Sequence, residues 1–367
     1  MSGARVVPRK FIRLAAAAVV LFVSIGLLEV GVRALAGMGY LPALRRGGAD
    51  DSFWDGRHPV YGVWHKPAAS RLHKTACFQI VYRTNSIGAR DVERSLRSTR
   101  PRVVVLGDSM LEGWGLPLEK RTTNILEART GVEHINLAMS HFGPYQEYLA
   151  YATLGRRYSH TAVLVGIHPF NDFYDLDYEV GQHSPGYLYA YRPYLVGTYP
   201  EYQRVDYRES GRERWLRRHV QTWNAFSLLW GRIGGPEEGF DRPAPFQTPA
   251  GIVRSRYYDF TPAQFDLLRY CLEQIVRAAD GKTVVVVLMP APPDFLRYAQ
   301  SGESPLAVRL EALGRVGGFR LVDLLPPMYR QTDTWEDYSF KCDYHWNAYG
   351  GAVAAEVLEA RLRGVIY

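Results

Sequence analysis

The stretch Val103-Val104-Val105-Leu106-Gly107-Asp108-Ser109 decides the fold of this 367-residue chain. Four consecutive apolar residues, three of them β-branched, favour a strand that is covered on both faces. A serine follows this strand closely, at the carboxyl end where open α/β sheets bind their ligands. A serine hydroxyl is a weak nucleophile at neutral pH and needs a positioned base. The stretch therefore predicts a parallel sheet with Ser109 at its ligand-binding edge.

Short apolar runs recur along the rest of the chain and alternate with helical segments. Strands are expected at 103–106, 134–137, 162–167, 283–289 and 320–324, and helices at 119–129, 145–156, 262–279, 305–313 and 348–362. Alternation of strand and helix is typical of right-handed crossovers between parallel strands. We therefore expect an α/β fold of three layers, in which helices cover both faces of a doubly wound parallel sheet.

A base and an acid for Ser109 are available near the carboxyl terminus, in Asp343-Tyr344-His345-Trp346-Asn347. A histidine that is oriented by a carboxylate is the usual activator of a serine nucleophile. Nucleophile, acid and base would then follow one another along the chain in the order Ser109, Asp343, His345. A serine at this place can also cap a helix, and this second role is compatible with the first.

Four short blocks fall at the carboxyl ends of predicted strands or in the loops that follow them. The blocks are Gly107-Asp108-Ser109, Asn136 to Gly143, Gly166 to Asp172, and Asp343 to Asn347. Their order, spacing and placement resemble the SGNH (GDSL-type) hydrolase family over roughly residues 101 to 362. The segment Thr84 to Asp91 is similar to membrane-anchored bacterial members of this group. The resemblance implies a flavodoxin-like SGNH fold and a serine hydrolase that acts on ester bonds.

The resemblance also implies roles for single residues. Ser109 would be the nucleophile, His345 the general base and then the acid, and Asp343 the residue that holds the imidazole, with Gly107 and Asp108 in support. The family often writes the last block as Asp-x-x-His. In this chain Cys342 occupies that aspartate position, and Asp343 is its substitute.

An oxyanion hole needs hydrogen-bond donors that point at the developing negative charge. The family pattern assigns the backbone N–H of Ser109 and the side chain of Asn171, whose alternative role is that of a turn residue. The third donor, usually a glycine, falls on His141, where a positive φ would strain a residue other than glycine. Gly143, two positions later, is the alternative donor.

The amino terminus reads as a targeting segment. An uncharged apolar run from Leu14 to Leu28 follows a basic cluster, which predicts a cytoplasmic amino terminus and an exported body at the periplasm or cell surface. As a signal anchor the helix would stay in the membrane; as a signal peptide it would be cleaved near Ala34-Leu35-Ala36. We favour the anchor because Glu29 and Arg33 suit the end of a membrane helix better than a cleavage region.

The expected organisation has three parts. A tail and membrane anchor occupy residues 1–37, a β-rich lead-in with a strand at 78–83 occupies 38–100, and the hydrolase domain occupies 101–367. An insertion at about 174–258 is rich in tyrosine and arginine: Tyr187, Tyr189, Tyr191, Arg192, Tyr194, Tyr199, Tyr202, Arg212, Arg214, Arg217 and Arg218. It can form a wall of the site that stacks on sugars and pairs with anions, or a plain cover over the sheet.

Composition excludes several classes of protein. Four of the seven excess positive charges, on Arg5, Arg9, Lys10 and Arg13, precede the apolar run, and the remainder is too diffuse for nucleic acid. No HExxH motif, P-loop, dinucleotide loop or Gly-x-Ser-x-Gly elbow occurs, so no metal or cofactor is expected.

The three cysteines, Cys77, Cys271 and Cys342, do not form a disulfide framework. A single disulfide can form, but we favour a buried apolar role for each cysteine.

These observations leave three functions open. We favour an esterase that cleaves an acyl ester, with an O-acylated carbohydrate or surface polysaccharide as its substrate. The same three residues would also serve an O-acyltransferase, which would need an acyl-donor partner in the membrane. The third alternative is an inactive protein that binds glycans or acts as a scaffold.

Overall fold

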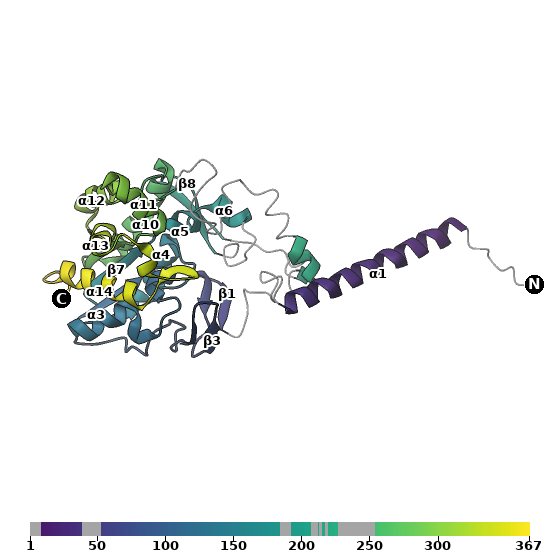
Figure 1. Cartoon of the computed structure of the whole chain (residues 1–367), viewed down its shortest axis with the longest axis horizontal. Helices are drawn as coiled ribbons and strands as arrows, with labels where there is room; N and C mark the ends of the chain where they lie inside the picture. The colour runs from purple at the N-terminus through teal and green to yellow at the C-terminus, as the bar shows by residue number, and fades with distance from the viewer. Residues whose placement is uncertain are drawn as a thin grey trace, which may run out of the picture. The chain divides into compact units, whose positions relative to one another are not determined.

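A computed structural model describes residues 9–38, 53–183, 192–206, 212, 215–216, 219–226 and 254–367 of the chain (Figure 1). The chain divides into two compact units. One contains Met1–Gly48 and Arg208–Glu237, and the other contains Ala49–Tyr207 and Glu238–Tyr367. The second unit holds the sheet and every candidate active-site residue.

Five parallel strands form the central sheet of this unit. They are β5 (Arg102–Leu106), β6 (Glu133–Asn136), β7 (Ala162–Ile167), β10 (Thr283–Leu288) and β11 (Arg320–Asp323), and they lie in the order β11-β10-β7-β5-β6. All residues of β5 and β7 are buried, as strands covered on both faces must be. The strand order is the flavodoxin-like one, whose switch point lies between β5 and β7. The prediction of a doubly wound α/β fold is therefore confirmed, and Ser109 follows a strand at the switch point.

Helices form a layer on each face of the sheet. Helix α3 (Thr122–Thr130) packs on α14 (Ala348–Leu362), while α10 (Pro262–Ala279) packs on α4 (Pro144–Thr153) and α12 (Pro305–Gly317) (Figure 1). The first pair and the second group lie on opposite faces, because the right-handed crossover from β5 to β6 runs in the opposite direction to those that follow. The five predicted helices are confirmed, with ends that differ by a few residues. The helix predicted at 119–129 starts at Thr122 in the structure, because Leu118–Lys120 forms a separate 3-10 turn before α3.

Several short elements were not predicted from the periodicity of apolar residues. They are α2 (Ser109–Glu112), α5 (Pro169–Asp175), α6 (Tyr178–His183), α11 (Pro292–Ser301), α13 (Leu325–Gln331), β12 (Ser339–Phe340) and β13 (Asp343–Trp346). Most span two turns or fewer, too short to show a helical repeat. Three of them, α2, α5 and β13, carry candidate active-site residues.

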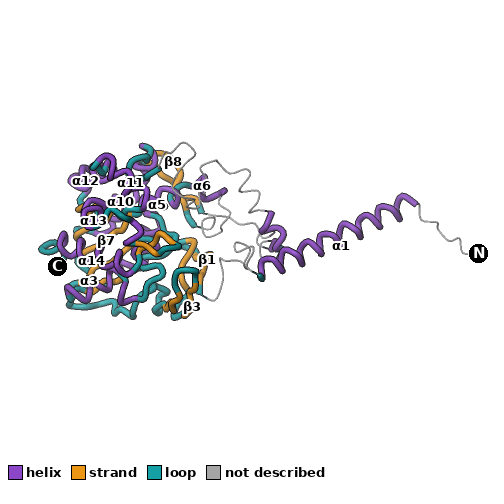
Figure 2. Tube along the Cα trace, in the orientation of Figure 1, coloured by secondary structure: helices purple, strands orange, loops and turns teal. Residues whose placement is uncertain are grey.

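The lead-in folds as two antiparallel hairpins in the same compact unit as the sheet. β1 (Trp54–His58) pairs with β2 (Gly62–His65), and β3 (Ser70–Lys74) pairs with β4 (Gln79–Arg83), the strand predicted at 78–83. Figure 2 shows β1 and β3 in orange at one side of the body. The rings of Phe53 and Tyr82 lie 6.2 Å apart and join the two hairpins.

Only part of the insertion lies within the described residues. Its hairpin of β8 (Tyr194–Thr198) and β9 (Glu201–Val205) packs on α10, with the rings of Tyr202 and Tyr270 4.9 Å apart and the Tyr199 hydroxyl 3.1 Å from the Glu273 carboxylate. This hairpin therefore acts as a cover over a helix. Six of the insertion's predicted wall residues lie outside the described residues: Tyr187, Tyr189, Tyr191, Arg214, Arg217 and Arg218.

The first unit contains α1 (Arg9–Gly37), a helix long and apolar enough to cross a membrane. Its one acidic residue, Glu29, accepts hydrogen bonds from the N–H groups of Gln221 and Thr222, both at 2.8 Å, and from Arg33 at 2.7 Å. Glu29, which lies with Arg33 near the end of the apolar run, therefore has polar partners in a distant part of the chain.

Candidate active site

Ser109, His345 and Asp343 form a continuous hydrogen-bonded chain. The Ser109 hydroxyl lies 2.7 Å from Nε2 of His345, and Nδ1 of His345 lies 2.5 Å from Oδ1 of Asp343. All three side chains come from segments at the carboxyl edge of the sheet, Ser109 from the start of α2 and the other two from β13. The arrangement lets His345 take a proton from Ser109 while Asp343 stabilises the resulting imidazolium.

The unusual spacing of Asp343 and His345 has a simple structural reason. Both residues lie on β13, where side chains two positions apart point to the same face of the strand. An Asp-x-His sequence on a strand therefore places the carboxylate beside the imidazole. Burial raises the pKa of Asp343, but hydrogen bonds from His345 and Trp114 outweigh it and hold the pKa below its usual value.

Trp114 is a site residue that the sequence did not single out. Its indole N–H donates to Oδ2 of Asp343 at 3.0 Å, and its ring stacks on His345 with centroids 5.4 Å apart. Trp114 thus donates a hydrogen bond to the carboxylate oxygen of Asp343 that His345 does not contact. Tyr344 also stacks on His345, at 5.1 Å, and Phe170 packs against Tyr344 at 4.9 Å. These three aromatic side chains are only partly buried and line the site beside the histidine.

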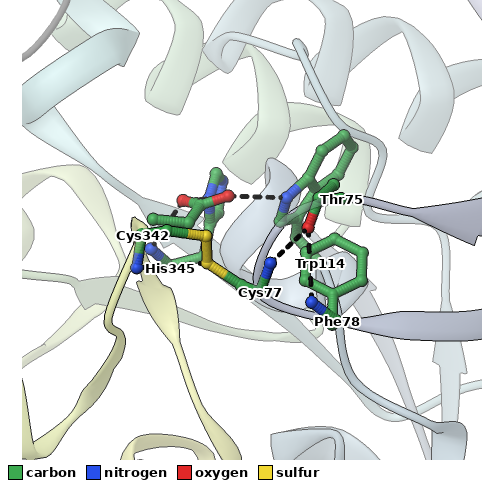
Figure 3. The surroundings of a disulfide bond; sticks show 7 residues. Thr75, Cys77, Phe78, Trp114, Cys342 and His345 are labelled. Atoms are coloured by element: carbon green, nitrogen blue, oxygen red, sulfur yellow. Dashed lines mark hydrogen bonds and ion pairs between the residues drawn. A yellow bond between two sulfur atoms is a disulfide. The ribbon is translucent and has the colours of Figure 1, made fainter.

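A disulfide joins Cys77 to Cys342, directly before Asp343 (Figure 3). The preference for buried apolar roles for all three cysteines is therefore wrong for Cys77 and Cys342; only Cys271 is a buried free thiol. The disulfide ties the β3–β4 hairpin of the lead-in to β13, the strand that carries Asp343 and His345. Figure 3 shows it beside His345 and Trp114.

Asp108 directly precedes Ser109 and holds the start of α2. Its carboxylate caps α2 by accepting the Met110 N–H at 2.9 Å, and its other oxygen lies 3.2 Å from Nδ1 of the buried His168. Asp108, and not Ser109, is thus the cap of this helix. Burial raises the pKa of Asp108, but its hydrogen bonds to His168 and Met110 hold that pKa below the usual value.

The carboxyl end of α2 is held by the lead-in. The Arg90 guanidinium donates to the carbonyl oxygens of Glu112 at 2.6 Å and Gly113 at 2.7 Å, and it also reaches Leu116. The Gly113 carbonyl also accepts the Leu116 N–H at 3.0 Å, and carbonyls at the carboxyl end of a helix favour a cation as a further partner. Arg90 belongs to the segment Thr84 to Asp91, whose sequence is similar to membrane-anchored members of the family.

The second block forms a loop that is tied to α2. The buried Glu112 carboxylate accepts both the N–H and the hydroxyl of Ser140, and its other oxygen lies 3.4 Å from Nε2 of His65 in β2. The next residue, His141, has a φ of 70°, the left-handed conformation that glycine usually adopts. Burial lowers the pKa of His141 to about 4, and the Arg192 charge adds to this effect.

Gly143 has a different environment from His141. It caps α4 with an extended φ of −112°, and its N–H donates to Oε1 of Gln146 at 3.3 Å. A Cβ at this position would lie 2.7 Å from Cβ of Asp175, so the glycine makes room for that side chain. Gly107 contributes its carbonyl, which accepts the Met139 N–H of the same loop at 3.0 Å.

Asn171 lies on α5, directly after β7, with its amide partly buried. Its Nδ2 donates to Oδ2 of Asp175 at 2.8 Å. Two further carboxyls, Glu147 and Asp172, are fully buried nearby, and burial together with the neighbouring carboxylates raises the pKa of both well above the usual values. Among the described residues, no group of three or more His, Cys, Asp or Glu side chains could hold a metal ion.

A scan against protein-family models and a search of curated proteins found no match. Solved structures with a similar chain path include TesA, 12% identical, where the match covers 72% of this chain and 98% of that one at a TM-score of 0.40. A member of the lipolytic protein G-D-S-L family from Veillonella parvula is 10% identical, with 71% and 96% covered and a TM-score of 0.34. The psychrotrophic esterase EstA from Pseudoalteromonas sp. is 11% identical, with 72% and 97% covered and a TM-score of 0.37.

Proposed function

We propose that this chain is a serine hydrolase of SGNH type, which cleaves an acyl ester through an acyl-Ser109 intermediate. The observation that carries the proposal is the chain of contacts from Ser109 to Nε2 of His345 at 2.7 Å and from Nδ1 to Asp343 at 2.5 Å. A serine in contact with an imidazole whose other nitrogen faces a carboxylate is the arrangement that acyl transfer requires.

The reaction would proceed in two halves. As Ser109 Oγ attacks the ester carbonyl carbon, His345 takes its proton and Asp343 stabilises the imidazolium. The tetrahedral intermediate then collapses, the ester C–O bond breaks, and the departing alcohol receives the proton from His345. In the second half, water gives its proton to His345 and attacks the acyl-serine, and the proton returns to Ser109 as the acid leaves.

The negative oxygen of each tetrahedral intermediate needs donors that are already in place. We assign the N–H of Ser109, the N–H of His141 and the side-chain amide of Asn171. The φ of 70° at His141 supports its place in this set, because the backbone adopts the conformation that a glycine donor would have. The N–H of Gly143 already donates to Gln146, which favours His141 over the alternative.

The substrate class that we propose is an O-acylated carbohydrate. Trp114, Tyr344 and Phe170 line the site beside His345 and are partly exposed. Flat aromatic faces pack against the apolar faces of sugar rings. A sugar hydroxyl bound there could also accept the acyl group in place of water, which would make the enzyme an O-acyltransferase.

We also propose that α1 anchors the enzyme in a membrane, with the catalytic unit outside the cytoplasm. The basic residues before α1 favour this orientation. The Cys77–Cys342 disulfide is consistent with an oxidising compartment. The hydrogen bonds of Glu29 to residues 221 and 222 favour a helix that stays attached.

The test is hydrolysis of nitrophenyl acetate and butyrate by the full chain in mild detergent. We expect Ser109→Ala and His345→Ala to lower kcat by about four orders of magnitude, while Ser95→Ala, at an exposed serine, leaves it unchanged. A fluorophosphonate probe should label the wild-type chain and spare Ser109→Ala. Activity and labelling that persist in Ser109→Ala would contradict the proposal. Addition of an O-acetylated oligosaccharide, with free acetate and acetylated acceptor measured side by side, separates hydrolysis from transfer.

A further inference from the structure

A buried arginine of the insertion, Arg192, contacts Asp175 on α5, the helix that carries Asn171. Arg192 is 0% exposed, and its Nη1 lies 3.0 Å from Oδ1 of Asp175, whose side chain is 1% exposed. The same nitrogen donates to the backbone carbonyl of Asp175 at 3.2 Å. A buried carboxylate with a buried cation beside it is held in one geometry, because neither charge can turn to water.

Asp175 uses its second oxygen for Asn171. Oδ2 accepts the Asn171 side-chain N–H at 2.8 Å, and the two residues lie four positions apart on α5, on the same face of the helix. The contacts therefore run without interruption from Arg192 to Asp175 to the amide that we assign to the oxyanion hole.

Two glycines far apart in the sequence make room for this chain of contacts. A Cβ at Gly143 would lie 2.7 Å from Cβ of Asp175, and a Cβ at Gly62 would lie 2.2 Å from Cα of Arg192. Gln146 donates to the carbonyl of Pro193 at 2.7 Å and fixes the backbone beside Arg192. The lead-in, α4 and the insertion thus meet at the pair of Arg192 and Asp175, which cannot move without disturbing all three.

We propose that Asp175 and Arg192 are positioning residues of the oxyanion hole, which hold the Asn171 amide with its N–H₂ group toward the reacting oxygen. The inference rests on the proposed function. An ionised carboxylate only accepts hydrogen bonds, so it selects the N–H₂ end of the amide and rejects the carbonyl end. One N–H then points to Asp175 and the second remains for the oxyanion. A flipped amide would present its oxygen to the negative charge and destabilise the tetrahedral intermediate.

The charge on Arg192 is needed because the position of Asp175 disfavours ionisation. Burial raises the pKa of Asp175 to about 6, although Arg192 and Asn171 act in the opposite direction. Without the guanidinium, the carboxyl would hold a proton over a wider pH range and could donate to the Asn171 carbonyl. The amide would then be free to turn to the unproductive orientation.

The experiment is a double-mutant cycle on the full chain in detergent, with kcat, KM and the rate of fluorophosphonate labelling as readouts. Asn171→Ala removes the donor and should lower kcat by about 100-fold. Asp175→Ala should lower kcat by about 10- to 100-fold with KM changed less than about threefold. The double variant should be no slower than Asn171→Ala alone, because Asp175 acts only through the amide. Arg192→Met should resemble Asp175→Ala, and Arg192→Lys should recover part of the rate.

Asp294→Asn is the matched control, because Asp294 is equally buried with a pKa also raised to about 6, yet bonds to Ser255 and Ala291 instead. Its effect on kcat should multiply with that of Asn171→Ala. If Asp175→Ala fails to fold, the isosteric Asp175→Asn takes its place in the cycle. If the losses of kcat in Asp175→Ala and Asn171→Ala multiply in the double variant, or if Asp175→Ala changes KM alone, this inference is overturned and the proposed function stands. Equal rates for wild type and Ser109→Ala would overturn both.

Discussion

Removal of the Cys77–Cys342 disulfide should weaken both the fold and the catalytic geometry. The bond closes a loop between residues that are 265 positions apart, which contains the whole sheet. The chain-entropy relation for such a loop gives about 5.6 kcal/mol of stabilisation at 25 °C, slightly above the roughly 2 to 5 kcal/mol that removal of a native disulfide typically costs. For Cys77→Ser with Cys342→Ser we therefore expect a loss of about 3 to 5.6 kcal/mol in the free energy of unfolding. Serine is tolerated at both sites because Cys77 is half-buried and Cys342 is exposed.

The assay is urea unfolding of the full chain in mild detergent, followed by tryptophan fluorescence, with and without a thiol reductant. The double variant should unfold at lower urea and ignore the reductant. Cys271→Ala is the matched control, since it removes the free buried cysteine and leaves the disulfide intact. It should keep the response of the wild type to reductant.

Activity provides the second readout, because the disulfide directly precedes Asp343. A freer Asp343 spends less time against His345, so kcat should fall by about tenfold or more even where the chain is fully folded. A double variant that unfolds within about 1 kcal/mol of the wild type would refute the loop-closure reasoning. An unchanged kcat would refute the link between this bond and the acid–base pair.

Three further changes test single contacts. Trp114→Phe keeps the ring on His345 but removes the donor to Asp343, and should lower kcat by about tenfold, since a hydrogen bond to a charged group contributes about 1.5 kcal/mol or more; steady-state kinetics would show it. Burial lowers the pKa of His134 to about 4, so the folded chain keeps this imidazole neutral above that pH. In the unfolded chain its pKa is near 6.5, so the free energy of unfolding is highest above pH 6.5 and falls as the pH drops toward 4. Between pH 7 and 4.5, His134→Gln should therefore lose about 2 kcal/mol less unfolding free energy than the wild type, and equal losses would contradict the assignment. His141→Gly relieves the positive φ and should raise the unfolding free energy by about 1 kcal/mol with kcat within about threefold, whereas a much larger loss of activity would mean that the imidazole itself takes part.

The sheet could be predicted because its strands are buried on both faces. Runs such as Val103 to Leu106 need no polar alternation, and the helices between them are long enough to show their own period. The short helices α2 and α5 were missed because their length hides any period. Pro169 at the first position of α5 was an available signal, and with it the four-residue spacing of Asn171 and Asp175 could have been noticed.

Other parts of the site depend on contacts between distant segments. The pairing of Cys77 with Cys342 follows from the approach of the lead-in hairpin to β13, which sequence spacing does not reveal. Trp114 follows the nucleophile helix and meets Asp343 only when β13 is in place. Arg192 appeared in the sequence as one of several arginines in the insertion, and its burial is seen only in the structure.

The hydrogen bonds of Arg90 bear on how this protein can be shortened for laboratory work. A version that begins at the first strand of the sheet would lack Arg90, whose guanidinium donates to the carbonyl oxygens of Glu112 and Gly113. It would also lack Tyr82, whose hydroxyl accepts the Gly115 N–H at 2.9 Å and whose ring lies 3.9 Å from the Arg90 guanidinium. The nucleophile would then sit on a single turn of helix with a frayed end. A fragment that is used to test activity should therefore start before Ser70, the first residue of β3, so that it keeps both Tyr82 and Arg90.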